Sequence, residues 1–292
     1  MRSRLIAARL VLCLFFVYVF FLCYRPVIFA QQESPTAIPS INLIASPNEF
    51  DFEKAYRDYV QVYNSYVQAH KEYLLAKNQY EAYKTLTAKT IALEQTIRML
   101  QSRDEVIAAF LITLRAKLAE ETNIASSKLN VLYLLLDEEI TWYRQHRETL
   151  TSAGTIPDLI KISNLAQSRY NRTESYIYQS LLEMFLYKED IFQDLVARQI
   201  EVIDDKIIEI RNRADKDTST IERWLLEAKN RKSRSEEKFS ELKSYTITEK
   251  LKSSEKNHSF NGSVYVIEQG HQYLKETLGA LIEIVKEIKR GD

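Results

Sequence analysis

Apolar side chains recur every three or four residues over most of the chain, which is the spacing of an amphipathic helix. The clearest run follows Asn48. It places large side chains seven residues apart at Phe52, Tyr59, Tyr66, Tyr73 and Tyr80, with smaller ones between them at Ala55, Val62, Ala69 and Ala76. This is the knobs-into-holes spacing of packed helices. We therefore predict a helix that begins near Asn48 or Glu49, with Asn48 as its N-cap.

A second apolar stripe lies beside the first and predicts a second neighbour for the same helix. Its members are Tyr56, Val60, Tyr63, Val67, His70 and Leu74. The ladder of tyrosines is also compatible with a surface that stacks on carbohydrate. The regular seam favours core packing, with the hydroxyl groups reaching water or polar neighbours at the edge of the bundle.

The remaining helices are separated by few turn signals. Residues 151–157 form the one convincing turn, with Gly154 as a C-terminal cap and Pro157 as the first residue of the next helix. Residues 257–263 contain Asn261-Gly262 and predict a polar loop. A last helix, residues 264–290, follows with a 3-4 register at Val264, Ile267, His271, Leu274, Leu278, Leu281, Val285 and Ile288.

These elements predict an all-α protein built on a long antiparallel hairpin, residues 49–256, with its turn at 151–157. Residue i of the first helix then lies near residue 307 minus i of the second, and the C-terminal helix packs at the base beside residues 52–80. Such a hairpin half-exposes two apolar patches, residues 106–114 and 131–136. The alternative is therefore a compact multi-helix bundle with breaks near Ser102, Thr122 and Asp217.

Composition supports the helical prediction. The chain has 292 residues with only five glycines and five prolines, and between Pro47 and Gly262 only Gly154 and Pro157 occur. Sheet proteins need frequent turns, and turns use these residues. Both cysteines, Cys13 and Cys23, lie in the N-terminal apolar segment, so the rest of the chain must be stabilised by helix packing without disulfides.

The N-terminal segment predicts where the protein goes. Residues 10–24 are an uncharged, strongly apolar run preceded by three arginines, which orients the N-terminus toward the cytoplasm. Residues 1–30 are read either as a signal peptide cleaved between Ala30 and Gln31, or as an uncleaved membrane anchor that uses residues 5–24. Both readings place residues 31–292 outside the cytoplasm, with residues 31–48 as a Pro/Ser-rich linker.

The charge balance bears on partners. The full chain has 40 basic and 40 acidic residues, and removing the four arginines of residues 1–30 leaves a small acidic excess. A dedicated nucleic-acid binder would be basic, so no nucleic-acid partner is expected. The densest basic run, residues 229–234, has acidic residues on both sides and is read as an exposed helix face.

Candidate chemistry is sparse. The four histidines are His70, His146, His258 and His271, and a single ExxH motif joins Glu268 to His271. A di-iron bundle needs that motif twice, with two further carboxylates, so His70 and His271 are read as packing residues. The carboxylate pairs Glu138/Glu139 and Asp204/Asp205 are read as solvated helix faces. We therefore expect no catalytic residue, no metal site, no cofactor and no small-molecule substrate.

The sequence favours a non-catalytic, extracytoplasmic coiled-coil protein that acts as a spacer, scaffold or docking arm of the cell envelope. Its expected partner is another protein or a second copy, bound through the helical seams. Two other hypotheses are a membrane-active or pore-forming bundle, motivated by the patches at 106–114 and 131–136, and an envelope hydrolase, motivated only by size and a cleft between helices.

Overall fold

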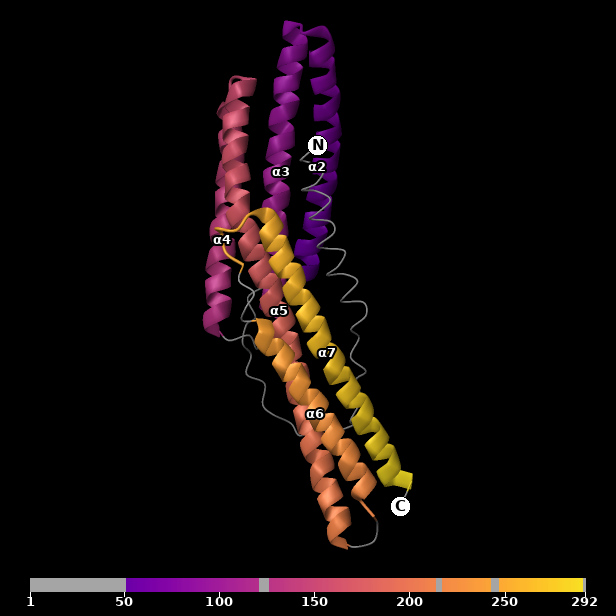
Figure 1. Cartoon of the computed structure of the whole chain (residues 1–292). Coiled ribbons are helices and arrows are strands. Elements are labelled where there is room, and N and C mark those ends of the chain that lie inside the picture. The colour runs from indigo at the N-terminus through magenta and orange to yellow at the C-terminus, as the bar shows by residue number, and fades with distance from the viewer. Residues whose placement is uncertain (1–50, 121–125, 214–216, 243–246, 291–292) are drawn as a thin grey trace, which may run out of the picture. The chain divides into compact units, whose positions relative to one another are not determined.

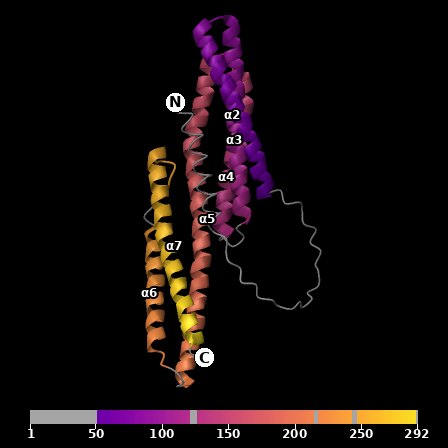
Figure 2. The same cartoon turned by 90° about the vertical axis from the view of Figure 1, so that its right-hand side faces the viewer.

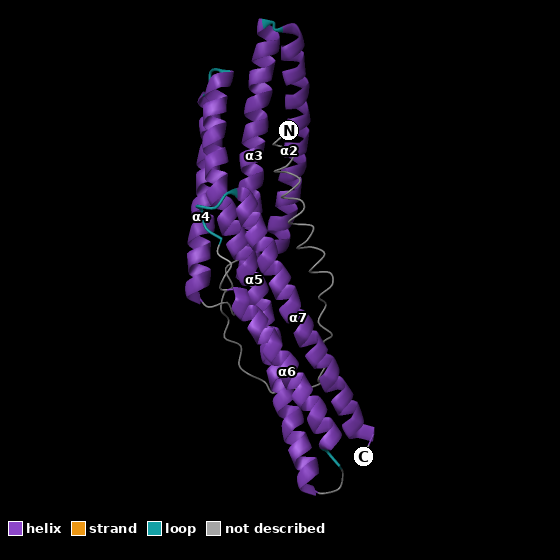
Figure 3. Ribbon diagram, viewed as in Figure 1, coloured by secondary structure: helices purple, strands orange, loops and turns teal. Residues whose placement is uncertain are grey.

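The computed structural model of the chain describes residues 51–120, 126–213, 217–242 and 247–290. In chain order these form α2 (Phe52–Tyr83), α3 (Leu86–Glu120), α4 (Ser126–Thr149), the 3-10 turn η1 (Leu150–Ser152), α5 (Ile156–Arg213), α6 (Ser219–Glu241) and α7 (Ser253–Arg290) (Figures 1 and 3). Helices make up 94% of this part of the chain and no strand occurs in it, which confirms the all-α helical bundle. The predicted leader or anchor at 1–30 and the linker at 31–48 lie outside the described residues, as does Asn48.

The first long helix of the predicted hairpin does not form, because the chain reverses at Lys84. Asp51 is the N-cap of α2, and its side chain accepts a hydrogen bond from the main-chain nitrogen of Lys54 at 3.2 Å. Lys84 ends α2 in the left-handed conformation, with φ of 50°, and donates its main-chain N–H to the carbonyl of Tyr80. α3 then runs back along α2 (Figure 2). The left-handed conformation has a modest steric cost for a lysine. The free energy gained by packing α2 against α3 is larger than that cost.

The predicted seam of α2 faces α3. Tyr59 and Ala76 are buried, and the ring of Tyr59 lies 5.8 Å from that of Phe110. The hydroxyl of Thr113 donates to the carbonyl of Ala55 at 3.0 Å. The apolar patch of residues 106–114 is consequently buried over most of its circumference. A fold-back of the same chain therefore covers the patch that a simple hairpin would leave half-exposed.

The break predicted near Thr122 is confirmed, because α3 ends at Glu120 and α4 begins at Ser126. No break occurs at Ser102, which lies inside α3. Its S-x-x-E motif does not start a helix because the helical apolar pattern continues through it.

The turn at 151–157 is present, and α4 and α5 pair across it as the hairpin predicted. His146 meets Ile162, and Glu139 meets Arg169. Gly154 does not cap with a positive φ. Thr155 caps α5 instead, because its hydroxyl accepts from the main-chain nitrogen of Asp158 at 3.3 Å and donates to the Asp158 carboxylate at 2.6 Å.

The second half of α5 packs with α6 and α7 around a shared core. α5 contributes Val196, Ile200, Ile203 and Ile207, α6 contributes Ile221, Leu225 and Ala228, and α7 contributes Leu274, Leu281, Ile284 and Ile288. The break predicted near Asp217 is confirmed, because α5 ends at Arg213 and α6 begins at Ser219. The Asp217 carboxylate accepts from the main-chain nitrogen of Ser219 at 2.9 Å.

The predicted loop at 257–263 is wrong, because α7 begins at Ser253 and passes through it. Half of the predicted register of α7 holds, since Ile267, Leu274, Leu281 and Ile288 are buried. The other half is shifted by one residue, to Ser263, Gly270, Thr277 and Ile284. Small side chains at three of these positions let neighbouring helices approach closely.

The predicted position of the last helix is also wrong. α7 packs against α5 and α6, and it runs parallel to α5, because Lys256 contacts Asn171 while His271 contacts Glu189. α2 already has α3 along its seam, so α7 is not needed there.

Among the described helices, none is both long enough and apolar enough to span a bilayer.

Candidate functional site

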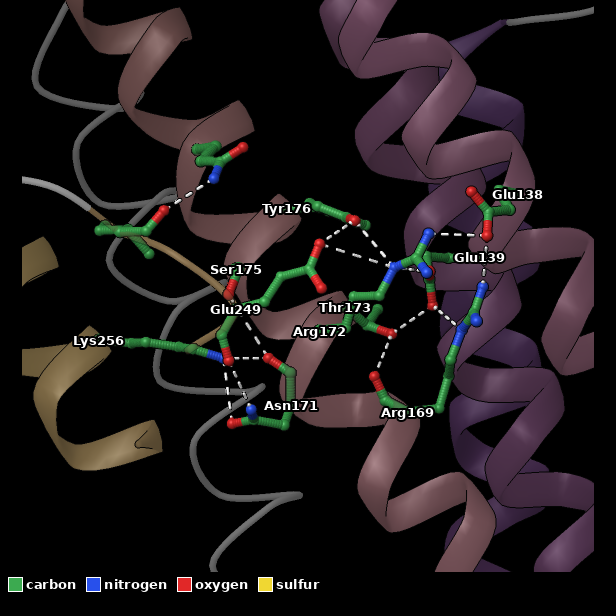
Figure 4. A network of polar contacts seen from close by, with 12 residues as sticks. Glu138, Glu139, Arg169, Asn171, Arg172, Thr173, Ser175, Tyr176, Glu249 and Lys256 are labelled. Carbon is green, nitrogen blue, oxygen red and sulfur yellow. Dashed lines mark hydrogen bonds and ion pairs between the residues drawn. The ribbon is translucent and has the colours of Figure 1, made fainter. Parts of the chain in front are cut away.

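Polar side chains, several of them buried, gather at two places, one where α3, α4 and α5 meet and one between α4 and α5. The first is the pair of Asp104 on α3 and His146 on α4. The second, which we call the glutamate–arginine cluster, comprises Glu138 and Glu139 of α4, Arg169, Arg172, Thr173 and Tyr176 of α5, and Glu249 from the segment before α7 (Figure 4). Buried charges are costly unless they are paired. The partners of each charge therefore show which role the charge has in this fold.

Asp104 and His146 form a buried hydrogen-bonded pair. The Nδ1 atom of His146 lies 2.5 Å from the Asp104 carboxylate, and its Nε2 atom lies 3.0 Å from the carbonyl oxygen of Ile162. Arg103 donates to the other oxygen of Asp104 at 2.9 Å and to the hydroxyl of Ser163 at 3.0 Å. Trp142 stacks on the imidazole with ring centroids 4.7 Å apart.

This pair is unsuited to acid–base catalysis. A catalytic histidine held by an aspartate needs its second ring nitrogen free to exchange a proton with substrate. In His146 that nitrogen is held by a main-chain carbonyl, and both side chains are buried. The pair joins α3, α4 and α5 at one point.

The glutamate–arginine cluster joins α4 to α5. Arg169 donates from Nε to Glu139 at 2.9 Å and from its terminal nitrogen to Glu138 at 2.9 Å. Arg172 reaches Glu138 at 2.7 Å and lies 3.3 Å from Glu139. The hydroxyl of Thr173 donates to Glu139 at 2.7 Å. Glu139 is fully buried, so the reading of Glu138/Glu139 as a solvated pair is wrong for Glu139.

The electrostatics follow from this geometry. Hydrogen bonds from Arg169, together with the charge of Arg172, hold the pKa of Glu138 below its ordinary value. Burial and a hydrogen bond to Glu249 raise the pKa of Tyr176 to about 12. Glu138 and the Oε2 atom of Glu139 are thus held by arginine or hydroxyl donors of α5, while the Oε1 atom of Glu139 is buried 3.3 Å from Nε of Arg172.

The cluster extends into the segment that leads to α7. The side-chain amide of Asn171 donates to the carbonyl of Glu249 at 3.0 Å, and that of Gln179 donates to the carbonyl of Ile247 at 2.8 Å. The hydroxyl of Ser253 donates to Glu174 at 2.7 Å. This segment is therefore fastened to α5 by side chains of α5 that bond to its main chain and to its polar side chains.

Lys256 completes the attachment. Its ammonium group donates to the main-chain carbonyl of Asn171 and, at 3.1 Å, to the side-chain oxygen of the same residue. The side chain is fully buried. Burial lowers its pKa from the ordinary value, and the charges of Glu174 and Glu249 oppose that effect.

The other histidines are dispersed. His271 bonds to Glu189 of α5 at 3.0 Å and lies against Phe192, which agrees with its reading as a packing residue. The ring of His70 lies between those of Tyr66 and Tyr73 on α2, tilted against each, with centroids 5.9 Å apart on each side. His258 and Glu268 are exposed. Within the described ranges, no three His, Cys, Asp or Glu side chains gather as metal ligands would.

The basic run of α6 has acidic neighbours as expected. Lys229 pairs with Asp204 at 2.5 Å, Arg231 pairs with Glu227, and Lys232 pairs with Glu236. Lys229 and Asp204 also border a shallow groove between α5 and α6 of about 210 Å³, which is smaller than most ligand pockets.

No protein-family model, curated protein or solved structure matches the chain.

Reading the sequence missed both buried clusters. Asp104 lies two residues before the apolar patch at 106–114, but Glu105 lies nearer to the patch and is partly exposed, so position beside the patch does not mark which acid is buried. Arg169 and Arg172 carry no signal either, because arginines three residues apart are common on solvated helix faces.

Proposed function

We propose that the protein is a non-catalytic helical interaction protein of the cell envelope, acting outside the cytoplasm as a docking arm for another protein. The observation that carries this proposal is an uncovered apolar row on α5, formed by Ile191, Leu195 and Val202. All three side chains are exposed to solvent. The row lies on the longest described helix of the chain, about 87 Å at the usual helical rise.

The row is separate from the core face of α5. At 3.6 residues per turn it lies about 130° round the helix from Val196, Ile200, Ile203 and Ile207, which face α6 and α7. Arg198 lies within the row and is itself exposed. An apolar row with an interspersed charge matches the face of another amphipathic helix, where apolar side chains supply affinity and the charge fixes register.

The closed state of the buried charges supports a non-catalytic role. Asp104, Glu139 and Glu189 are each paired with a cation, an imidazole or a hydroxyl donor inside the fold. Such pairs stabilise a particular arrangement of helices, and they offer little to a substrate.

The cellular location in this proposal comes from the sequence. The apolar run at 10–24 with its preceding arginines supports export, either with cleavage after Ala30 or with residues 5–24 kept as an anchor. A fusion of residues 1–48 to a reporter active only outside the cytoplasm tests it. We expect activity from the fusion and none from a control whose apolar run is interrupted by Val17→Arg.

The membrane-active alternative rests on two apolar patches. The patch at 106–114 is occupied by packing in the fold, and in the patch at 131–136 Leu132 and Leu136 are buried while Val131 and Leu134 stay exposed. The hydrolase rested on a cleft between helices, and the groove between α5 and α6 is small. The docking function therefore has the better support.

The docking proposal is tested by photocrosslinking in the native envelope. A crosslinking amino acid at Leu195 or Val202 should give a discrete adduct, identified by mass spectrometry, that the same residue at exposed Arg223 of α6 does not give. Ile191→Ser should weaken the adduct, whereas Leu165→Ser, on an exposed apolar residue of α5 outside the row, should leave it unchanged. Equal adducts from all positions, or none from the row, contradict the proposal.

A further inference from the structure

The turn between α2 and α3 carries the two most exposed large apolar side chains of the described residues. Tyr83 ends α2 with 72% of its surface exposed, and Leu86 begins α3 with 80% exposed. Lys84 and Thr85 connect them and are exposed too. We call residues 80–89 the hairpin tip. Neither side chain contributes to the seam between the helices, so the fold does not explain why they are apolar.

The hairpin tip is also cationic. Lys84 and Lys89 flank Leu86, and no acidic residue occurs between Glu81 and Glu94. Glu81 itself lies 3.8 Å from Lys77, so its charge is partly offset within α2. Tyrosine, leucine and lysine together are the residues that proteins place at the boundary between lipid headgroups and acyl chains. Lysines at that depth are attracted to anionic headgroups.

Chain length allows the tip to reach a membrane that holds the N-terminus. Residues 25–50 connect the apolar run to α2 and span up to about 85 Å when extended. α2 is about 48 Å long from its start at Phe52 to the tip. The tip can therefore turn back to the same bilayer.

We propose that the hairpin tip is a peripheral membrane contact that inserts Tyr83 and Leu86 among anionic lipid headgroups, with Lys84 and Lys89 pairing with phosphate. The contact is independent of the apolar row on α5, which lies on other residues. It holds one end of the α2–α3 hairpin at the bilayer surface and leaves the α5 row free for a protein partner.

The test places an environment-sensitive fluorophore on the tip of the full chain. Thr85→Cys is labelled after Cys13→Ser and Cys23→Ser remove the native thiols, and the protein is reconstituted into vesicles of phosphatidylcholine with or without phosphatidylglycerol. We expect a blue shift with the anionic vesicles that is smaller with phosphatidylcholine alone and that weakens as salt is added. A matched label at Ser152→Cys, in the exposed turn after α4, should show no shift.

Substitutions separate the contributions of charge and apolar area. Lys84→Gln and Lys89→Gln should each lower the ratio of inserted to free tip by about fivefold in anionic vesicles. Leu86→Ser should lower it at either lipid composition, while Leu165→Ser should leave it unchanged. Circular dichroism of each variant checks that the helices persist, which is expected because Lys84, Leu86, Lys89 and Leu165 are all exposed.

Several results overturn the proposal. Absence of a shift at residue 85 in every vesicle does so, as does an equal shift at residues 85 and 152. A shift that grows with protein density at fixed lipid indicates contact between tips of two copies. A shift seen only when envelope proteins are added to the vesicles indicates a protein partner for the tip.

Discussion

Tyr59 of α2 and Phe110 of α3 lie with their ring centroids 5.8 Å apart, brought together by the chain reversal at Lys84. Both side chains are buried, and Phe110 belongs to the apolar patch at 106–114. The contact shows how the patch is covered. The helix that carries the tyrosine seam folds back on it and leaves no need for a second molecule there.

The aromatic contact should be a main support of the α2–α3 hairpin. Phe110→Ala is expected to lower the free energy of unfolding by about 3–5 kcal/mol, because it leaves a cavity in a buried site. A double-mutant cycle with Tyr59→Ala should give a coupling of about 0.5–1.5 kcal/mol beyond area burial. Urea denaturation followed by circular dichroism measures both. Tyr83→Ala, at an exposed position of α2, is the control and should change stability little.

The Asp104–His146 pair should be strongly coupled. His146→Leu leaves a buried carboxylate that retains only Arg103, and we expect a loss of about 3–5 kcal/mol in the free energy of unfolding. The double variant Asp104→Leu/His146→Leu should lose much less than the sum of the two single variants, since no unpaired charge remains between the helices. Additive losses in denaturant titrations would show that the pair is not a unit.

Lys256 should make stability depend on pH. Burial lowers its pKa in the folded protein below the ordinary 10.5, so over the interval between these two values the unfolded chain binds more protons. Stability from this group therefore rises as pH increases through that interval toward 10.5 and is diminished below it. Glu174 and Glu249, which face the ammonium group, reduce the effect.

The measurement compares wild type with Lys256→Met, because partly buried tyrosines such as Tyr66 have raised pKa values and add their own opposite trend at alkaline pH. The difference in unfolding free energy, wild type minus variant, should increase from neutral pH toward pH 10. A flat difference over this range would mean that Lys256 keeps its ordinary pKa in the folded state, and a falling one that its pKa is raised; either result contradicts the prediction.

Gly270 should be required for the approach of α7 to α6. A Cβ atom at this position would lie 2.7 Å from the ring of Phe239, whereas one at Gly279 on the same helix would meet nothing within 4 Å. Alanine in place of glycine inside a helix normally stabilises by about 1 kcal/mol. We expect that gain for Gly279→Ala and its absence or reversal for Gly270→Ala. The variant Gly270→Ala should recover the gain in a Phe239→Ala background, as thermal unfolding can show.

The reversal at Lys84 marks where reading the sequence fell short. A helix end without glycine or proline gives no local signal, and a lysine adopts the left-handed conformation when packing offsets a cost of about 1–2 kcal/mol. At Thr122 and Asp217 the local signals were β-branched, small or capping residues, and the breaks there were predicted. Asn261-Gly262 gave a turn signal that the α7 seam overrode, because Ser263 and Val266 are buried by neighbouring helices.

The buried charges could not be placed for a different reason. Glu138 and Glu139 are adjacent and chemically identical, and both contact Arg169 and Arg172, yet only Glu139 is buried, because it also reaches Thr173 in the contact between α4 and α5. Whether a charged side chain lies in water or in a pair depends on residues some thirty positions away. The sequence pattern around Glu139 therefore does not predict this neighbour.

The sequence by itself determined that this chain is helical, where its apolar faces lie, and that 151–157 is a turn, because these follow from glycine and proline content and from a period of 3.6 residues. Only the tertiary structure decided which faces meet. It set α2 against α3, made α7 parallel to α5 and buried Asp104 beside His146. Helix faces of similar apolar character can pair in several ways, and the choice among them depends on side-chain fit and on charge pairing between distant segments, which exist only once the chain has folded.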